Sequence, residues 1–466
     1  MQQPHKTNTF IPIPHNVGSL PDWEVRLGYP QLLNMFVGGS NSLYCLPSLY
    51  ELAKGVPAQN TRAIHYSNYK SGSYIVVTND YVLKIDKIGS WSIIGNIKNT
   101  KLAVQIDENQ QNQIGIVDGQ NFYVYDQNKG GSIQKIGTTE GFEFKTPISI
   151  VVLNTITVIM DKDTNTVGIS SPNNMYIWSA LDTFQIQSQL TQAVSLETLS
   201  SNLYVFGTTG ISRYVPNSDN SPYLFPFTLD VNYRQDIGAI GTNSVIRGFN
   251  EIFFLSSKFV PMSLDVGNGL KELGQAPVTG IARIISEYKD INNCAGSFYS
   301  YRGNYFYSMT FQDSGTNWTY CQNSNTWSFN EDLIVDALRT GEVAATKKGI
   351  FKFGLIPIAS KKREWRSARI TNYKGLQPYR TSLSGFEARI IQGLQQTKET
   401  HYMELTISLD SESWLNTVKR PIGATGKRKD VTTWKITNLS AQEFTFKLTY
   451  QGTLDFTIDQ ITAIIK

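Results

Sequence analysis

The sequence predicts an all-β protein, and three observations support this prediction. Short segments rich in Val, Ile, Tyr, Phe and Thr recur along the 466 residues, separated by turns rich in Gly, Asn, Asp and Ser. Through most of the chain they repeat with a period of about 40–50 residues, the length of one propeller blade. Near the C-terminus the period gives way to longer segments in which apolar and polar residues alternate. We therefore expect a β-propeller body of six or seven blades with a C-terminal antiparallel β-sandwich or platform domain.

Composition narrows the class of protein. Only 17% of residues are charged and 12% are aromatic, with a formal net charge of +4, which describes a folded chain with a polar, largely uncharged surface. No apolar run approaches the roughly 18 residues of a spanning helix, and Met1 to Phe10 lacks the pattern of a signal peptide. The cysteines, Cys45, Cys294 and Cys321, are too few and too far apart for a disulfide framework or a zinc site. We expect three reduced, mostly buried thiols.

The first 60 residues are rich in proline and show little periodicity. We interpret residues 1–60 as an extended arm that packs on the platform or on a neighbouring subunit. Two segments carry moderate helical recurrence, Leu43 to Ala53 and Gln185 to Leu199, and are the candidate helices of an otherwise strand-rich chain.

Residues 61–357 contain the repeat. Comparable strand cores, each followed by a turn and a second strand, begin near Ser73, Gln113, Thr155, Asn202, Glu251, Asn304 and Glu342. A period of this length suits a blade, because a four-stranded sheet must stack on neighbours to bury both faces. A stack of β-sandwiches is the alternative, with similar strands at about 8–12 residue spacing and no longer period.

One segment of the repeat is more specific than the others. Tyr320 to Phe329, YCQNSNTWSF, contains a strand, a turn and a tryptophan, Trp327, that opens the next strand. In propellers this arrangement joins the two outer strands of a blade, with the Trp packed between sheets. It indicates packing and no chemistry.

Residues 358–466 differ in charge and pattern. They hold an excess of seven basic residues, whereas the rest of the chain has a small acidic excess. At least five strands are expected, and in Glu443 to Gly452 one face is apolar and the other polar. Their N-terminal end carries the basic residues Lys361, Lys362, Arg363, Arg366, Arg369 and Lys374. This segment could contact an acidic partner surface, contact DNA, or simply be a solvated linker.

Motifs for catalysis or cofactor binding are missing from the sequence. The four histidines are scattered, and no nucleophile elbow, phosphate-binding glycine loop or dinucleotide fingerprint occurs. The string Asp161 to Asn165 resembles the start of a calcium loop, but glycine and acid are absent from the required positions, so a hairpin turn is the better interpretation. Paired carboxylates for glycoside cleavage could still come from different blades. We predict no catalytic, cofactor-binding or metal-binding residues.

Ring assembly fits the composition better. Polar uncharged and aromatic side chains form large interfaces without the penalty of burying charges. A ring that conducts duplex DNA should also not be strongly basic, because each phosphate contact adds affinity and would slow passage.

Several stretches resemble a known family. Ile169 to Gln185 (ISSPNNMYIWSALDTFQ), followed by the strand pair around NLYVFGTTGISRY (Asn202 to Tyr214), resembles the tail hub or nozzle proteins of short-tailed bacteriophages, also called packaged DNA stabilisation proteins. Ser212 and Arg213 replace the family's usual acidic position. Further segments agree in order along nearly the whole chain: GYPQLLNMFVGG (Gly28 to Gly39), QDIGAIGTNSVIRGFNEIFFLS (Gln235 to Ser256), TYCQNSNTWSF with the later LRTG (Leu338 to Gly341), and Trp434 before a strand near the end.

The resemblance implies a structural virion protein of the phage tail without enzymatic activity. Six copies would form a ring below the portal and adaptor rings, retain the packaged double-stranded DNA and form the channel for its ejection. DNA would pass without sequence-specific binding, and tailspikes, fibres or a needle would attach outside or below. The protein would assemble in the host cytoplasm and reside in the virion.

A second function remains open at this point, that of a glycan-binding or glycan-cleaving propeller with a carbohydrate-binding sandwich. It rests on fold analogy alone.

Overall fold

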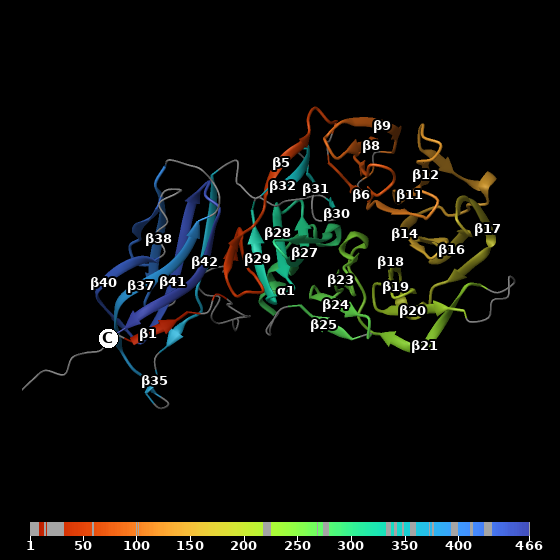
Figure 1. Cartoon of the computed structure of the whole chain (residues 1–466). Helices are drawn as coiled ribbons and strands as arrows, with labels where there is room; N and C mark the ends of the chain where they lie inside the picture. The colour runs from red at the N-terminus through yellow and green to blue at the C-terminus, as the bar shows by residue number, and fades with distance from the viewer. Residues whose placement is uncertain are drawn as a thin grey trace, which may run out of the picture.

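The computed structural model shows a β-propeller beside a second β-domain (Figure 1). It describes residues 9–465 except 14, 16–31, 58–59, 99, 101, 218–224, 268, 274–278, 332–336, 340–342, 347–348, 355–359, 372, 375–376, 393–398, 411–412 and 424–430. Within these residues, no helix is long and apolar enough to cross a membrane. Cys45, Cys294 and Cys321 lie buried as free thiols.

Six blades consist of four consecutive antiparallel strands each. The first three blades contain β6 (Ala63–Ser67), β7 (Ser73–Val77), β8 (Tyr81–Asp86) and β9 (Trp91–Asn96); β10 (Gln105–Glu108), β11 (Gln113–Val117), β12 (Phe122–Asp126) and β13 (Gln134–Ile136); and β14 (Pro147–Leu153), β15 (Ile156–Asp161), β16 (Thr166–Ser171) and β17 (Asn174–Gln185). The next three contain β18 (Ala193–Leu199), β19 (Asn202–Gly207), β20 (Ile211–Pro216) and β21 (Phe227–Gln235); β22 (Ile246–Arg247), β23 (Glu251–Leu255), β24 (Pro261–Asp265) and β25 (Leu270–Glu272); and β26 (Ala295–Tyr301), β27 (Asn304–Phe311), β28 (Thr316–Cys321) and β29 (Thr326–Asn330).

A seventh, composite blade closes the ring. Its strands are β30 (Ala337–Arg339), β31 (Val343–Thr346) and β32 (Gly349–Gly354), completed by the N-terminal strand β5 (Ser48–Ala53). The innermost strands β6, β10, β14, β18, β22, β26 and β30 contact one another in sequence order, and β30 returns to β6. Because β5 comes from the other end of the chain, the two ends of the propeller are joined through backbone hydrogen bonds.

The predicted repeat is confirmed strand by strand. The seven strand cores correspond to β7, β11, β15, β19, β23, β27 and β31, each the second strand of its blade. Hydrophobic clusters fill the spaces between adjacent blades; one buries Ile75, Ile114 and Ile116 between the first two. The period therefore reflects repeated stacking of sheets on both faces.

Two helix predictions were wrong. Leu43 to Ala53 forms β4 (Leu43–Cys45) and then β5, and Gln185 to Leu199 contains the end of β17, the short 3-10 helix η3 (Ser188–Leu190) and β18. Both segments pair with other strands, and this tertiary pairing overrides their weak helical periodicity. The remaining described helices are α1 (Thr279–Ser286), η2 (Thr138–Glu140), η4 (Thr242–Ser244) and η5 (Ile291–Asn293).

The turn predictions agree with the structure. Trp327 opens β29 after the β28–β29 turn, its ring lies 5.2 Å from that of Tyr320, and its indole nitrogen donates to Leu273 O of the preceding blade. Asp161 ends β15, and its carboxylate accepts hydrogen bonds from the backbone of Lys145, Thr146 and Thr164. The Asp161 to Asn165 string is therefore a hairpin turn.

The second domain, which we call the platform, is a sandwich of two sheets. One contains β3 (Met35–Val37), β4, β42 (Phe456–Ile465), β37 (Thr381–Gln392) and β40 (Val431–Ala441), with β1 (Thr9–Pro12) added to β42. The other contains β39 (Val418–Gly423), β38 (His401–Ser408), β41 (Glu443–Gly452), β33 (Lys361–Arg366) and β2 (Leu32–Leu33), with β34 (Ile370–Thr371) on β41. A separate ribbon contains β35 (Tyr373–Lys374) and β36 (Gln377–Pro378).

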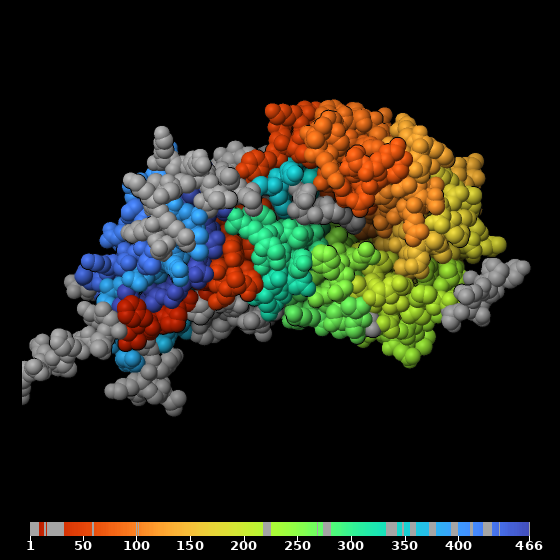
Figure 2. Space-filling model, in the orientation of Figure 1, coloured from red at the N-terminus to blue at the C-terminus, as the bar shows by residue number. Residues whose placement is uncertain are grey.

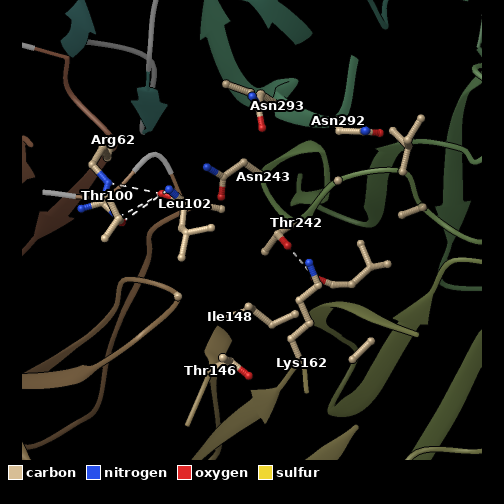
Figure 3. Close-up of a pocket in the computed structure, with 18 of the residues that line it drawn as sticks. Arg62, Thr100, Leu102, Thr146, Ile148, Lys162, Thr242, Asn243, Asn292 and Asn293 are labelled. Carbon is tan, nitrogen blue, oxygen red and sulfur yellow. Dashed lines mark hydrogen bonds between the residues drawn. The ribbon is translucent and has the colours of Figure 1, made fainter. Parts of the chain in front are cut away.

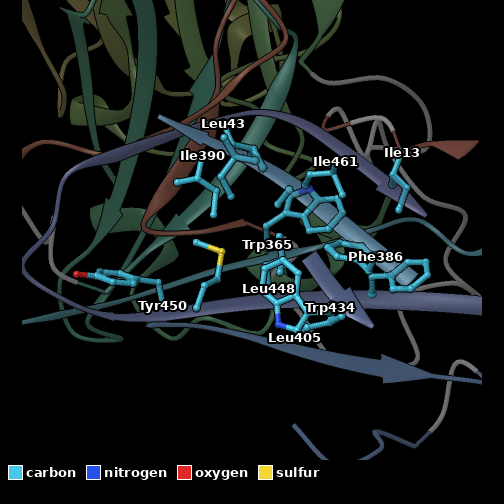
Figure 4. Close-up of a cluster of buried hydrophobic side chains, with 14 of the residues drawn as sticks. Ile13, Leu43, Trp365, Phe386, Ile390, Leu405, Trp434, Leu448, Tyr450 and Ile461 are labelled. Atoms are coloured by element: carbon cyan, nitrogen blue, oxygen red, sulfur yellow. The ribbon is translucent and has the colours of Figure 1, made fainter. Parts of the chain in front are cut away.

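The platform core lies between these sheets (Figure 4). Trp365, Phe386 and Trp434 are fully buried there. The apolar face predicted for β41 is confirmed, since Phe444, Phe446, Leu448 and Tyr450 are all buried. The opposite face is not solvated as expected, because Thr445 is buried and Lys447 and Thr449 are half-buried. Figure 2 shows the N-terminal strand β1, in red, lying against the blue C-terminal strands.

The described strands of residues 1–60 belong to both domains. β1, β3 and β4 pair with strands of the platform or each other, β2 lies between the domains, and β5 completes the propeller. The boundaries at residues 60 and 357 stay predictions, as does a contact between the arm and a neighbouring subunit.

Candidate functional site

The propeller axis is the first candidate site. At one end, the loops before the innermost strands enclose a cavity of about 890 Å³ (Figure 3). Asn, Gln, Thr and Ser form just under half of its described lining, the rest being small or aliphatic residues and the charged Arg62, Lys162, Asp163 and Asp313. No aromatic residue belongs to that lining, so the cavity offers no ring on which a sugar could stack.

The Arg62 side chain is held by hydrogen bonds to other parts of the chain. Its guanidinium donates to Thr100 Oγ1 at 2.6 Å and to the carbonyl oxygens of Leu102 and Asp118 at 3.0 and 3.1 Å. These bonds tie the entry of the first blade to the loops of the second, and Figure 3 shows the cluster on the wall of the cavity. Burial lowers the pKa of Arg62, and a guanidinium keeps its charge inside a protein. It therefore acts as a clamp between blades.

A glutamine links the inner strands of several blades beside the cavity. Gln105 of β10 accepts a hydrogen bond from Ser149 Oγ at 2.6 Å, and its amide nitrogen donates to Ser195 Oγ and Thr242 O, both at 3.3 Å. Ser149 in turn accepts from Leu196 N at 2.8 Å. The second blade is thus hydrogen-bonded to the third blade, to the fourth blade and to η4. The helix η4 precedes the fifth blade, which lies nearly opposite the second in the ring. This Gln105 network crosses the axis.

Acidic residues on the inner strand of the second blade also serve the fold. Glu108 accepts from Ser67 Oγ at 2.8 Å and Gln127 Nε2 at 2.7 Å, and lies 3.1 Å from His65 Nε2. Asp107 Oδ2 accepts from Val152 N at 2.6 Å. Among the described residues, no group of three or more His, Cys, Asp or Glu could hold a metal ion.

The junction between propeller and platform is built around Asn34. This buried residue follows β2, which pairs with β29 of the sixth blade on one side and with β33 of the platform on the other. Asn34 Nδ2 donates to Lys362 O at 2.8 Å, and Oδ1 accepts from Glu331 N at 3.2 Å. One continuous sheet therefore runs from the platform into the propeller. An ion pair between Arg302 and Asp455 adds a second link.

The predicted basic segment is an ordered part of the platform. Lys361, Lys362, Arg363 and Arg366 lie on β33, a strand paired on both sides. Its alternation sends Arg363 into the sandwich, where the side chain is 1% exposed and donates to Leu454 O at 3.1 Å. Arg363 is therefore unavailable to a surface partner, which corrects its inclusion in a contact segment. Lys374 lies on β35, and its side chain is outside the described residues.

The opposite face of β33 holds a charge cluster. Glu364, whose side chain is 3% exposed, accepts from Arg366 Nε at 2.6 Å and lies 3.2 Å from Lys362 Nζ. Arg366 and Lys447 lie over the ring of Trp414. Arg369 pairs with Glu443 at 3.0 Å. Much of the basic charge is thus paired within the platform, and Lys362, with its side chain 49% exposed, remains accessible.

Comparison with known proteins decides the family. A family model described as bacteriophage P22 Gp10, beta-propeller, matches residues 31–329. The chain belongs to this phage stabilisation family. It is therefore a structural phage tail protein of the podovirus nozzle type, involved in DNA stabilisation and located in the virion. The matched region includes β2 at its start and β29 at its end, the two strands that join at the propeller–platform junction.

Solved structures resemble the chain only weakly. Virginiamycin B lyase from Staphylococcus aureus is 11% identical, covers 66% of this chain and 98% of its own, and gives a TM-score of 0.46. The extracellular domain of a putative hybrid two-component system from B. thetaiotaomicron is 8% identical, covers 87% of this chain and 58% of its own, and gives a TM-score of 0.43. No curated protein matched the sequence.

Two residues of these sites, Gln105 and Asn34, are not marked by any pattern in the sequence. Gln105 is one of many glutamines, and only the closed ring places it next to Ser149, Ser195 and Thr242. Asn34 follows two leucines in an irregular stretch, and its role depends on β29 and β33, which are about 300 residues away in the chain.

Proposed function

We propose that the chain forms a ring-shaped tail nozzle or hub that retains packaged double-stranded DNA and forms the channel for genome ejection. The observation that carries the proposal is the family match, and the Gln105 network across the inner strands argues against a DNA path along the axis of one propeller. A duplex, whose major groove alone is about 12 Å wide, cannot pass a ring of strands crossed by the Gln105 side chain. The DNA path must then lie between copies of the chain, around a shared axis, and we expect six copies.

The composition supports a channel of this kind. Low charge leaves few phosphate contacts along the path, so DNA is retained by closure of the tube and not by adhesion to its wall. In this arrangement an adaptor ring lies above the nozzle, and a tailspike, fibre or needle attaches outside or below it. Lys362 is the member of the basic segment best placed to reach an acidic partner surface.

Family membership favours a structural role over catalysis. The glycan alternative loses support because the axial cavity has no aromatic residue in its described lining. The absence of enzymatic activity stays a prediction.

Imaging of intact virions tests the proposal. We expect six copies around the tail axis, with an open path between them. Particles assembled without the chain should lose their DNA, measured as nuclease-sensitive genome, while filled particles that contain it stay protected. Single copies at the tail periphery, or full retention without the chain, would contradict the proposed function.

A further inference from the structure

An apolar projection lies on the outer edge of the first blade. Ile88, at the tip of the β8–β9 turn, is 85% exposed, and Trp91 and Ile93 on one face of β9 are 36% and 48% exposed. Turn tips normally carry polar residues. Here the carboxylate of Asp86 accepts from Ile88 N at 3.0 Å and from Ser90 N at 2.8 Å, and so fixes the turn that presents isoleucine to solvent. We call Ile88, Trp91 and Ile93 the knob.

The knob is held rigidly. The Trp91 indole donates to Lys54 O at 3.0 Å, just after β5. Gly89, at φ 95°, approaches β5 so closely that a Cβ would lie 2.0 Å from Leu52 O. The apolar side chains are therefore preorganised for a contact, and little conformational entropy would be lost on binding.

A groove lies between the outer edges of the third and fourth blades. It has a volume of about 590 Å³, and its walls include Phe184, Tyr214, Phe225 and Phe227. The rings of Phe184 and Tyr214 are 4.6 Å apart, and those of Phe184 and Phe225 are 5.2 Å apart. This is a recess of suitable chemistry for an isoleucine and a tryptophan.

Irregular pairing in the outermost strands extends the groove outward. The register of β17 on β16 shifts between Thr183 and Trp178, and Leu181 in that bulge is 92% exposed and lines the groove. The register of β21 on β20 shifts between Arg234 and Leu229, and Val231 there is 81% exposed. Bulges re-aim side chains, and here both direct an apolar one into solvent.

Charges around the two surfaces are complementary. Lys54 and Lys87 are exposed beside the knob, and Asp182 is exposed beside Leu181 at the groove. The two surfaces differ in shape, sign and position, so they suit head-to-tail contact between identical chains and not a two-fold contact of one patch with itself.

Their positions fit a ring. The groove lies two and a half blades from β9, or three from the place where the knob meets β5 of the seventh blade, which is about 130–155° around a seven-bladed propeller. In a closed ring of six, the directions from one copy to its two neighbours differ by about 120°. We propose that the knob of each copy inserts into the groove of the next, with propeller axes parallel to the ring axis. This proposal rests on the ring of the proposed function and identifies its interface.

Cysteine crosslinking in assembled tails tests the contact. The variant carries Ile88→Cys and Leu181→Cys in one chain, and a short bis-maleimide is added to virions. Because the native Cys45, Cys294 and Cys321 are buried, we expect reaction only at the new thiols. The double variant should give a ladder of covalent multimers up to six, and neither single variant should give one.

Two controls complete the test. Ile88→Cys with Val266→Cys places the second thiol at a 44% exposed valine on the fifth blade, which the proposal leaves free, and should give no ladder. Ile88→Asp should prevent ring formation, whereas Val266→Asp should leave both the ring and the melting temperature unchanged.

Each remaining outcome is decisive. If imaging shows a ring but the double variant gives no ladder, the proposed interface is wrong while the proposed function stands. Crosslinking of either single variant to itself, or of the double variant only to another tail protein, also overturns the interface. If no ring exists in the tail, the proposed function itself fails.

Discussion

Asn34 shows how one residue can join two domains. Its backbone has φ 55°, a left-handed conformation that asparagine tolerates better than most residues. That conformation turns the chain out of β2, while the backbone carbonyl accepts from Leu46 N at 3.2 Å and the side chain bonds both domains. Few side chains could meet both requirements.

We predict that Asn34→Ala destabilises the protein by about 2–3 kcal/mol, from two lost hydrogen bonds and left-handed strain. Asn34→Gly should lose less, because glycine adopts the same φ without strain. Thermal unfolding and limited proteolysis between the domains measure both effects. Equal stability of the two variants would show that strain contributes nothing.

Glu364 explains why the basic segment could not be assigned from sequence. A run of lysines and arginines resembles a solvated surface, but strand alternation on β33 sends Arg363 inward and places Lys362 and Arg366 beside a buried carboxylate. Sequence shows the charges but not their partners.

Removal of the Arg366 side chain should therefore lower the free energy of unfolding, whether or not this segment also contacts a partner. Arg366→Gln leaves the buried Glu364 with Lys362 as its remaining ion-pair partner and with the charge of Lys447 nearby. We expect a loss of about 2 kcal/mol, below the roughly 3–5 kcal/mol typical of a fully buried pair. The double variant Glu364→Gln with Arg366→Gln should recover part of that loss in urea unfolding. Additive losses would mean that the pair does not interact. An assay of partner binding by Arg366 variants should use this double variant as its reference, because Arg366→Gln alone also changes stability.

His401 gives the platform a pH dependence. Burial lowers its pKa, and this effect outweighs the opposing charge of Glu399. The hydroxyl of Tyr450 accepts from Leu454 N and lies 3.1 Å from His401 Nδ1, within hydrogen-bond distance of the imidazole.

A depressed pKa means that the unfolded chain binds the proton more readily than the folded one below pH about 6.5. The stabilisation from neutral His401 is then fully present above that pH. It is lost as the pH falls toward the pKa of His401 in the folded protein, by at most about 1.4 kcal/mol per pH unit. The melting temperature should fall between pH 7.5 and 5.5, and His401→Asn should flatten the curve. His15, whose pKa burial also lowers, should keep part of the slope in that variant. A steeper slope in His401→Asn would contradict this origin.

At the scale of elements, the strands within a blade were predictable and the closure of the ring was not. The second strand of each blade is a largely apolar run of four to eight residues followed by a turn, a local signal. β5 has no such signal, because its identity comes from pairing with β32 about 300 residues later. The short strands β2 and β3 likewise form only where two domains meet.

Blade cohesion near the axis depends on Gln105. We predict that Gln105→Ala destabilises the propeller by about 2–4 kcal/mol, because the buried hydroxyls of Ser149 and Ser195 and the amide of Ile150 lose a partner. Hydrogen exchange should increase in the inner strands of several blades together. An effect confined to the second blade would show that the network does not link blades. Gln110→Ala, at an exposed turn near β10, is the matched control.

At the scale of the whole molecule, composition and family resemblance indicated assembly but not its surfaces. The knob depends on a turn that holds Ile88 outward, and the groove depends on register shifts in β17 and β21, none of which is visible as a pattern in the sequence. Their relative position also depends on how the blades follow one another around the propeller, because this order sets the angle between segments that are about 100 residues apart in the chain.

The knob-and-groove ring orients each copy. The bisector of the two contact directions passes through the second blade, and the platform is attached at the sixth, nearly opposite (Figure 1). In a closed ring, that bisector points to the common axis. In this proposed ring, the second blade faces the DNA path and the platform points outward.

This orientation predicts which surface lies near DNA. Lys135, exposed on the outermost strand β13 of the second blade, should face the path, and Lys419, 67% exposed on the platform strand β39, should not. We expect a photoreactive maleimide attached at Lys135→Cys to crosslink the packaged genome in intact virions, and the same probe at Lys419→Cys to leave DNA unmodified. Both positions are solvent-exposed, so loss of folding should not confuse the result. DNA crosslinking from Lys419→Cys alone would mean that the copies face the opposite way, with the platform lining the channel.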